Sequence, residues 1–358
     1  MINVLMVVPN RSDATSLYRS MGPFSELRRQ QEFNMIFSAT ADWSIARMVD
    51  SVFLQRPFTD DHRRLVELCR QWNVPVWVDY DDLLFDLPTD NPAYPVYMNE
   101  QTRKNIVQIV KLATVVTVST PQLKACLQLE KNSLNQRVYV VPNALLDCLE
   151  SKKAVRNDKP LIAWRGSNTH QRDLAAYAAP MIDFAKERPK TTFNFIGWNP
   201  WFVTDSMQAN QAIVAPAMEI GEYFDYLTRV APYAMVVPLD KSMFNLCKSN
   251  IAWIEGVLAG AVAIAPDWAE WRRPGVLTYT DEASFKSCLE FAIDHPKEMA
   301  DYHRMSWNFI KDGLMVSQVN KTRLRILNAL YAESRGRKAD WPAGGERQQQ
   351  TDELLELE

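Results

Sequence analysis

The amino-acid sequence predicts an α/β protein made of two doubly wound domains. Short apolar runs that indicate buried strands alternate along the chain with longer segments that indicate helices. The alternation lapses in the polar stretch 150–159 and then starts again. At 358 residues the chain is long for one hydrophobic core and long enough for two. We therefore expect one domain over residues 1–150, a second over 151–333, and a disordered tail over 334–358.

The predicted strands are short, mostly apolar runs, as expected for strands that are buried on both faces of a parallel sheet. In the first domain they are 2–8, 33–37, 51–54, 74–78, 114–118 and 138–141. In the second domain they are 161–164, 192–196, 212–214, 234–237, 261–265 and 276–279. The predicted helices are 16–29, with a break near Gly22 and Pro23, 60–72, 100–112, 121–130, 171–188, 221–230 and 245–258, followed by helical sequence from 296 to about 333.

The composition is that of an ordinary globular protein, with 47% hydrophobic and 23% charged residues. The 40 basic and 43 acidic residues give a net charge of −3, which demands neither nucleic acid nor an anionic membrane as a partner. The sequence has no apolar run as long as a membrane span and no signal-peptide pattern, so we expect no integral membrane segment and a cytoplasmic location. Its five cysteines form no CxxC pair, which favours reduced thiols over a zinc site.

Only 11 glycines are present, and neither GxGxxG nor GxxxxGK[ST] occurs. This absence disfavours an oxidoreductase on paired dinucleotide-binding domains. Any phosphate group would have to be bound by helix N-termini and cationic side chains instead.

Ionisable and polar residues follow several of the predicted strands. In doubly wound folds the ligand lies beyond the carboxyl ends of the strands, so these residues are the candidates for a site. They are Tyr18 and Arg19; Asp79, Asp81 and Asp82; Arg165, Gly166, Ser167 and His170; Gly197; and Asn245, Lys248, Ser249 and Glu255.

The three carboxylates of the DYDD run, Asp79, Asp81 and Asp82, allow three interpretations. They could bind a divalent metal, although no second carboxylate cluster is present to complete the coordination. They could supply a general base or orient an acceptor hydroxyl. They could also cap the next element, with Asp82 as the N-cap. We rank the second and third interpretations equally.

The segment Arg165–His170, RGSNTH, places a cation, a glycine and small hydroxyl residues just before a predicted helix. This combination suits a diphosphate, which backbone N–H groups and Arg165 would hold. The alternative is a capped turn with Ser167 or Thr169 as the cap. The arginine favours the functional interpretation.

The stretch 244–260 carries the second candidate phosphate site. Asn245, Lys248 and Ser249 are residue types that suit a helix N-terminus facing an anion. Lys248 and Glu255 are seven residues apart, so on one helix they would share a face about 10 Å apart. That spacing suits a lysine on phosphate and a carboxylate on sugar hydroxyls. The alternative is a capped core helix with two solvated charges.

With these segments in hand, residues 1–330 resemble the two-domain GT-B glycosyltransferases, particularly the retaining branch that uses sugar nucleotides. The resemblance rests on the order of YRSMGPFSEL, VPVWVDYDDLLFDLP, IAWRGSNTHQRDL and VVPLDKSMFNLCKSNIAWIEGVLAGAVAIA. It implies two Rossmann-like domains that face each other across a cleft. It also implies that Glu255 holds the donor ribose, that Arg165 and Lys248 neutralise the donor diphosphate, and that Asn245 and Ser249 support the phosphates.

The resemblance further implies transfer of a sugar from a nucleotide-sugar donor, such as a UDP-sugar, to an acceptor hydroxyl. The first domain would bind the acceptor through Tyr18 and Arg19, and the DYDD carboxylates would position its hydroxyl. We expect no metal cofactor, because cations and helix N–H groups would carry the leaving-group charge. A glycan, a protein or a modified DNA base each fits as the acceptor.

Cys247 departs from the pattern of the retaining relatives, which carry a glutamate eight residues before the position of Glu255. The contacts of that glutamate with the transferred sugar have no counterpart here. This departure favours the alternative hypothesis, a non-catalytic protein that binds nucleotides or sugars on the same scaffold.

Overall fold

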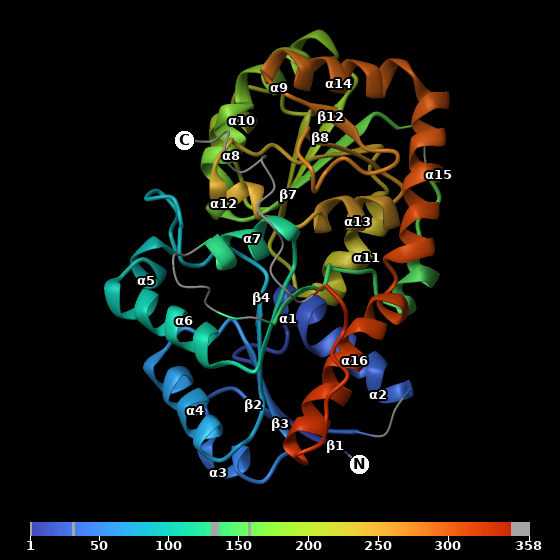
Figure 1. Cartoon of the computed structure of the whole chain (residues 1–358). Coiled ribbons are helices and arrows are strands. Elements are labelled where there is room, and N and C mark those ends of the chain that lie inside the picture. The colour runs from blue at the N-terminus through green and yellow to red at the C-terminus, as the bar shows by residue number, and fades with distance from the viewer. Residues whose placement is uncertain (1, 31–32, 130–134, 136, 157–158, 345–358) are drawn as a thin grey trace.

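The protein contains two parallel β-sheets, each covered by helices on both faces (Figure 1). The structure is a computed structural model that describes residues 2–30, 33–129, 135, 137–156 and 159–344. Each sheet has six strands, and neighbouring strands run parallel. The predicted α/β class and the two doubly wound domains are therefore confirmed.

The first sheet has the strand order β2-β1-β3-β4-β5-β6. Its strands are β1 (Ile2–Val7), β2 (Phe33–Ser38), β3 (Ser51–Gln55), β4 (Val76–Tyr80), β5 (Val115–Val118) and β6 (Val138–Val140). Successive residues of a strand point to opposite faces. In β3, Val52 and Leu54 therefore belong to the core on one face and Phe53 to the core on the other. Burial on both faces explains why the strands are continuous apolar runs.

The helices of the first domain cover both faces of this sheet. They are α1 (Ala14–Arg19), α2 (Met21–Gln30), α3 (Trp43–Ala46), α4 (Asp60–Gln71), α5 (Tyr94–Tyr97), α6 (Glu100–Leu112) and α7 (Pro121–Leu129). Polar caps fix where two of them begin: Thr59 accepts a hydrogen bond from the backbone N–H of His62 in α4, and Asn99 accepts one from Thr102 in α6. Apolar residues of α4, α6 and α7 form one core with the sheet, and those of α2 belong to the core on the opposite face.

The second sheet has the strand order β12-β11-β10-β7-β8-β9. Its strands are β7 (Leu161–Arg165), β8 (Thr192–Gly197), β9 (Ala212–Pro216), β10 (Ala234–Val236), β11 (Val262–Pro266) and β12 (Leu277–Tyr279). The helices of this domain are η1 (Asp147–Lys152), η2 (Asn168–His170), α8 (Gln171–Ala176), α9 (Ala178–Glu187), α10 (Trp201–Thr204), α11 (Ile220–Val230), α12 (Met243–Leu246), α13 (Ile251–Leu258), α14 (Glu282–Asp294) and α15 (Pro296–Gly313). Helices α9 and α14 cover one face of the sheet, and α11 and α13 cover the other.

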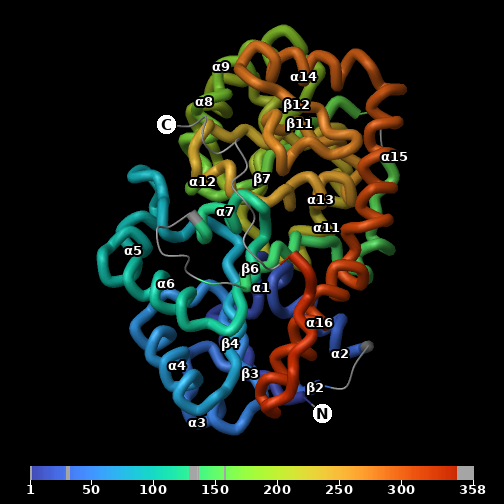
Figure 2. Tube along the Cα trace, in the orientation of Figure 1, coloured from blue at the N-terminus to red at the C-terminus, as the bar shows by residue number. Residues whose placement is uncertain are grey.

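The last helix, α16 (Val316–Ser334), returns to the first domain and lies beside α2 (Figure 2). Its buried residues Ile326, Leu327 and Leu330 share a core with Phe24 of α2. The predicted division placed this helix with the second domain, whereas its apolar face packs on the first sheet. No helix in the described part of the chain is long and apolar enough to cross a membrane.

The residues that follow α16 pack against the first domain as far as the described chain extends. Trp341 stacks on Tyr139, with ring centroids 6.4 Å apart, and Arg137 lies 4.6 Å over the Trp341 ring. Lys124 Nζ donates a hydrogen bond to the carbonyl oxygen of Gly344 at 2.8 Å. The prediction of a disordered tail concerned 334–358, of which 345–358 lie outside the described residues.

Each predicted strand is present, and its ends agree to within about two residues. The predicted break in 16–29 is present, at Ser20 between α1 and α2, and two further predicted helices are divided. The segment 171–188 forms α8 and α9, and 245–258 forms only part of α12 and all of α13. The strand pattern was thus the more reliable guide to the topology, because apolar runs record burial directly.

The division between α12 and α13 corrects one prediction, because Lys248 and Ser249 lie in the turn between these helices. Lys248 therefore does not share a helix with Glu255. Side chains of the first domain hold this turn: Thr120 Oγ1 donates to the carbonyl oxygen of Cys247 at 2.9 Å, and Asn143 Nδ2 donates to Ser249 Oγ at 2.8 Å. These contacts across the domains replace the backbone bonds of a continuous helix.

Asn245 was also expected at the N-cap, but Ser242 occupies that position and accepts a hydrogen bond from the backbone N–H of Asn245. The Asn245 side chain is instead buried, with Nδ2 donating to Asp173 Oδ1 at 2.6 Å and Asp240 Oδ1 at 2.5 Å. It does not line the cavity that contains Lys248.

Arg19 and Asp79 form a buried ion pair inside the first domain. Asp79 lies within β4 rather than beyond its end, because the strand continues to Tyr80. Arg19 Nε and Nη2 donate to the two Asp79 oxygens at 2.9 and 2.8 Å, and Nη1 donates to the Val141 carbonyl at 2.6 Å. Neither residue lines the interdomain cavity. The pair joins α1 to β4 and to the end of β6.

Replacing Arg19 by alanine is expected to lower the free energy of unfolding by about 3–5 kcal/mol, because Asp79 would remain buried without its counter-ion. Urea denaturation followed by circular dichroism measures the change. Arg29→Ala in α2 is the matched control, since its side chain is 73% exposed and its loss should cost less than about 1 kcal/mol. Equal stability of both variants would contradict a structural role for Arg19.

Candidate active site

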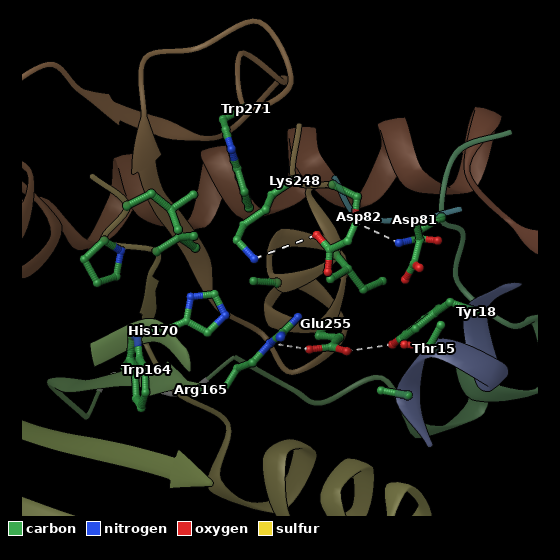
Figure 3. A pocket seen from close by; sticks show the side chains of 18 of the residues that line it. Thr15, Tyr18, Asp81, Asp82, Trp164, Arg165, His170, Lys248, Glu255 and Trp271 are labelled. Atoms are coloured by element: carbon green, nitrogen blue, oxygen red, sulfur yellow. Dashed lines mark hydrogen bonds and ion pairs between the residues drawn. The ribbon is translucent and has the colours of Figure 1, made fainter. Parts of the chain in front are cut away.

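A cavity of about 220 Å³ lies between the two domains, where the carboxyl ends of both sheets meet (Figure 3). Both domains contribute polar and aromatic side chains to its wall. The first domain contributes Thr15, Tyr18, Arg56, Asp81, Asp82 and Asn143, and the second contributes Trp164, Arg165, His170, Lys248, Ser249, Glu255 and Trp271. The structure therefore brings together eight of the residues that the sequence singled out: Tyr18, Asp81, Asp82, Arg165, His170, Lys248, Ser249 and Glu255.

Glu255 is the most enclosed carboxylate of the cavity, with an exposed fraction of 3%. Tyr18 donates its hydroxyl to Oε1 at 2.7 Å, and Tyr223 donates to Oε2 at 2.8 Å. Arg165 Nε lies 2.9 Å from Oε2. Because Tyr18 belongs to α1 and Glu255 to α13, this cluster joins the two domains at the base of the cavity (Figure 3).

Burial and charge act together on this cluster. Burial and the neighbouring Glu255 carboxylate raise the pKa of Tyr18 well above its ordinary value, so its hydroxyl stays protonated and donates. Burial of Arg165 opposes its charge, but the Glu255 carboxylate overcomes this effect and raises the pKa of the guanidinium. Arg165 and Glu255, the two residues predicted to bind the sugar donor, are thus paired with each other in this structure.

Lys248 lies on the opposite side of the cavity, in the turn between α12 and α13. Its Nζ is 3.9 Å from Asp82 Oδ1 of the first domain and 4.3 Å from the ring centroid of Phe244. At 3.9 Å the ion pair with Asp82 is weak, so this ammonium group is available to a stronger anion. Figure 3 shows Lys248 pointing into the same space as Arg165 and His170.

The remaining DYDD carboxylates are held by an arginine at the end of β3. Arg56 contacts both oxygens of Asp81, and its Nη2 lies 3.2 Å from Asp82 Oδ2. Burial works against ionisation of Asp81, but the Arg56 guanidinium overcomes this and holds the pKa of the carboxyl below its usual range. Asp81 is therefore a charged acceptor, and both carboxylates lie at the wall of the cavity. The described residues include no group of three His, Cys, Asp or Glu side chains arranged to hold a metal ion.

His170 lies between Trp164 and Lys248 in the cavity wall (Figure 3). Its Nδ1 is 2.8 Å from Asp173 Oδ2. Burial is the largest cause, and together with the cations Lys248 and Arg165 it lowers the pKa of His170 to about 3. The imidazole is therefore neutral in this structure at any physiological pH.

Comparison with known proteins gives a fold but no sequence family. No protein-family model matches the chain, and no curated protein sequence matches it. Among solved structures, a UDP-forming trehalose-phosphate synthase from Burkholderia vietnamiensis has a TM-score of 0.64 at 10% identity and covers 94% of this chain and 99% of its own. HepE of Anabaena, solved in complex with UDP, has a TM-score of 0.62 at 12% identity and covers 91% and 99%.

A putative UDP-N-acetylglucosamine 2-epimerase from Listeria monocytogenes shares the same arrangement, with a TM-score of 0.56 at 11% identity over 95% and 98% of the two chains. TarM matches with a TM-score of 0.56 at 8% identity, and the chain spans only 55% of its length. The chain has the GT-B fold. At these identities the likeness establishes the fold alone, so the chemistry has to be argued from the cavity.

Three predicted site residues of this GT-B protein lie near the cavity but outside its lining. Gly166 and Gly197 bring the ends of β7 and β8 together: a Cβ atom on Gly197, whose φ is +100°, would lie 2.6 Å from the Gly166 carbonyl oxygen. Ser167 accepts a hydrogen bond from the backbone N–H of Thr169 and caps η2. These residues shape the loop that carries Arg165 and His170.

Sequence reasoning missed several residues that the GT-B cleft brings into the site. Arg56 and Asn143 both follow strands directly, so the strand-end rule that identified Asp81 would have found them. Trp271 lies in the stretch DWAEW, which begins directly after β11. Tyr223 comes from the middle of α11, and no local pattern marks it as a partner of Glu255.

Proposed function

We propose that this GT-B protein transfers a sugar from a nucleotide-sugar donor, with the donor diphosphate bound by Arg165 and Lys248. The observation that supports this most strongly is the convergence of these two cations on one cavity at the strand ends of the second domain. Neither is matched there by an ideal partner, since Lys248 is 3.9 Å from its carboxylate and Arg165 approaches Glu255 through Nε. A diphosphate would provide oxygens to both.

Charge develops on the diphosphate as the bond to the sugar breaks, and fixed cations in a dry site stabilise that charge strongly. Lys248 would exchange its long contact with Asp82 for a phosphate oxygen. The exchange would release Asp82, which lies on the first domain, to accept a hydrogen bond from the acceptor hydroxyl. Binding of the donor would thus move Lys248 to the diphosphate and, in the same step, free Asp82 to bind the acceptor hydroxyl.

We propose that donor entry requires the domains to separate. About 220 Å³ is below the range of about 300–1,000 Å³ that is common for small-molecule sites. Glu255 would also have to exchange Arg165 for the ribose hydroxyls if it holds the ribose. We propose that the structure represents the closed arrangement without donor, and that opening admits the nucleotide sugar.

We further propose a UDP-sugar as donor, no metal cofactor and retention of configuration. The UDP-bound HepE structure supports the choice of nucleotide, and the paired cations support transfer without a metal. Retention is what the resemblance in sequence order implies, and the coupling constant of the anomeric proton in the product measures it by NMR. The acceptor stays open among a glycan, a protein and a modified DNA base.

Lys248→Ala tests the donor site directly. We expect it to weaken binding of a nucleotide sugar by about 10–100-fold, because a charged hydrogen bond to phosphate contributes about 1.5–3 kcal/mol. Isothermal titration calorimetry with a panel of UDP- and GDP-sugars measures the affinity. Lys241→Ala is the matched control, because Lys241 lies in the same connection, is exposed and does not line the cavity.

The reaction itself is tested by incubation of the protein with the same donors and a panel of acceptors. Release of nucleoside diphosphate that depends on the acceptor supports glycosyl transfer. Conversion of the donor to an epimeric sugar without acceptor would instead support the activity suggested by the Listeria neighbour. Binding without any turnover would favour the non-catalytic alternative.

A further inference from the structure

The imidazole of His170 is held in one orientation by a chain of hydrogen bonds behind it. Asp173 Oδ2 lies 2.8 Å from His170 Nδ1, and Asp173 itself is 5% exposed. Asp173 Oδ1 accepts from Asn245 Nδ2 at 2.6 Å and from the backbone N–H of Asp240 at 3.2 Å. A carboxylate accepts, so Nδ1 must carry the ring proton and donate it.

This tautomer leaves Nε2 of His170 without a proton, and no hydrogen-bond partner for Nε2 occurs among the described residues. The charged groups that surround the ring are Lys248 and Arg165 of the second domain, Asp82 of the first domain, and Asp173 behind it. The bare nitrogen therefore faces the space between two cations, where the proposed diphosphate would bind (Figure 3). Its lone pair would repel a phosphate oxygen at hydrogen-bond distance.

We propose that His170 takes up one proton when a nucleotide sugar binds, and that Asp173 is the positioning residue that directs this proton to Nε2. The proposal rests on the proposed function and defines how the same site depends on pH. Solvent supplies the proton, which adds to the Nε2 lone pair; no bond of the ligand breaks. The imidazolium then donates from Nδ1 to Asp173 and from Nε2 to a phosphoryl oxygen.

Electrostatics provides the driving force. In the free protein, burial, Lys248 and Arg165 all oppose a charge on the ring, which holds the pKa of His170 at about 3. The bound diphosphate places two negative charges between Lys248 and Arg165. These negative charges offset the repulsion that the two cations exert on a protonated ring, so the pKa of His170 rises when the donor binds. The bound imidazolium would then donate a hydrogen bond to the leaving diphosphate during transfer.

The sign of the pH dependence follows from linkage. The complex binds one more proton than the free protein between the free pKa of His170 and its higher pKa in the complex. Donor affinity therefore rises as the pH falls through the bound pKa, by up to about tenfold per pH unit. Arg165, whose pKa is raised, stays charged in this range and contributes no slope of its own.

Calorimetry of donor binding in buffers of different ionisation enthalpy measures the proton count. UDP-glucose and GDP-mannose are suitable probes, because both phosphoryl groups of a nucleotide sugar are esterified and do not titrate near neutral pH. We expect uptake that approaches one proton per site at about pH 6 and is smaller at about pH 8. His170→Gln should abolish the uptake, and His295→Gln, at an exposed site on another face, should preserve it.

Asp173→Asn tests the positioning role, because an amide can donate to Nδ1 and thereby favour the other tautomer. We expect a reduced proton count and a flatter dependence of affinity on pH, whereas a merely structural role would change affinity without changing the slope. Donor binding with no proton uptake at either pH would overturn this inference and leave the proposed function standing. Uptake that persists in His170→Gln would overturn it as well. If no nucleotide sugar binds at all, the proposed function fails first.

Discussion

Replacing Arg165 by alanine is expected to lower turnover by about 10²–10³-fold, the largest loss among single changes in the cavity. The guanidinium lies on the second domain and is paired with the buried carboxylate of Glu255. Its removal takes away charge stabilisation of the leaving diphosphate. It also leaves Glu255 without a counter-ion. The initial rate of nucleoside diphosphate release, at donor concentrations above the Michaelis constant, measures the loss in kcat.

Arg172→Ala is the matched control, because Arg172 follows in the same connection, is 58% exposed and does not line the cavity. Its rate should stay within about twofold of the parent rate. Arg165→Lys separates charge from geometry: a lysine keeps the charge but cannot form the planar fork, so we expect an intermediate rate. Thermal melting of each variant identifies any loss of stability from the uncompensated Glu255. A stable Arg165→Ala variant with the parent turnover would show that the diphosphate does not bind at Arg165.

The sheet topology could be predicted from the sequence because buried parallel strands appear there as short, continuous apolar runs. Runs such as 52–54 and 261–265 are apolar at every position, and that pattern depends on burial of the strand itself. No such local pattern predicts that α16 packs on the first sheet. Its apolar residues, such as Ile326 and Leu330, indicate an amphipathic helix but not which sheet it covers. Such a choice depends on contacts between residues that are far apart in the sequence.

The candidate site was predicted where a residue's own position determined its role. Arg165 is the last residue of β7 and Asp82 lies just beyond β4, so both line the cavity at strand ends and the strand-end rule was enough to find them. The same rule placed Asp79 wrongly, because β4 extends two residues beyond its apolar run and the buried partner Arg19 neutralises the extra carboxylate. The mutual pairing of Arg165 with Glu255 is a tertiary contact, and no local sequence pattern predicts it.

The turn around Cys247 contains another tertiary contact that no local sequence pattern predicts, and this contact leads to a testable prediction. Cys247 Sγ lies 3.5 Å from Sγ of Cys126, which is in α7 of the first domain. The hydrogen bond from the Cys247 thiol holds the pKa of Cys126 below its ordinary value. Cys247, which stands where the retaining relatives carry a glutamate, is thus one of two cysteines whose thiols contact each other across the domains. Either thiol alone would look like an ordinary buried cysteine in the sequence.

Oxidation with diamide is expected to join Cys126 to Cys247 and to lower turnover by more than about tenfold. The Cys126 thiolate adds to the diazene, and the Cys247 thiol then displaces the adduct, so that a disulfide forms and the diazene is reduced to a hydrazine. The bond would tie α7 to the turn that carries Lys248, and donor exchange requires the domains to separate if the cavity is closed as proposed. Dithiothreitol should restore the rate.

Thiol titration under denaturing conditions and peptide mapping identify the linked pair. Cys126→Ser is the control, because it removes one partner and should make turnover insensitive to diamide. The closed loop of more than a hundred residues should also raise the free energy of unfolding by about 4–5 kcal/mol in the oxidised protein. If the disulfide forms and turnover is unchanged, nucleotide sugars enter without separation of the domains. The small cavity would then have to expand around the donor by side-chain movement alone, starting with the release of Arg165 from Glu255.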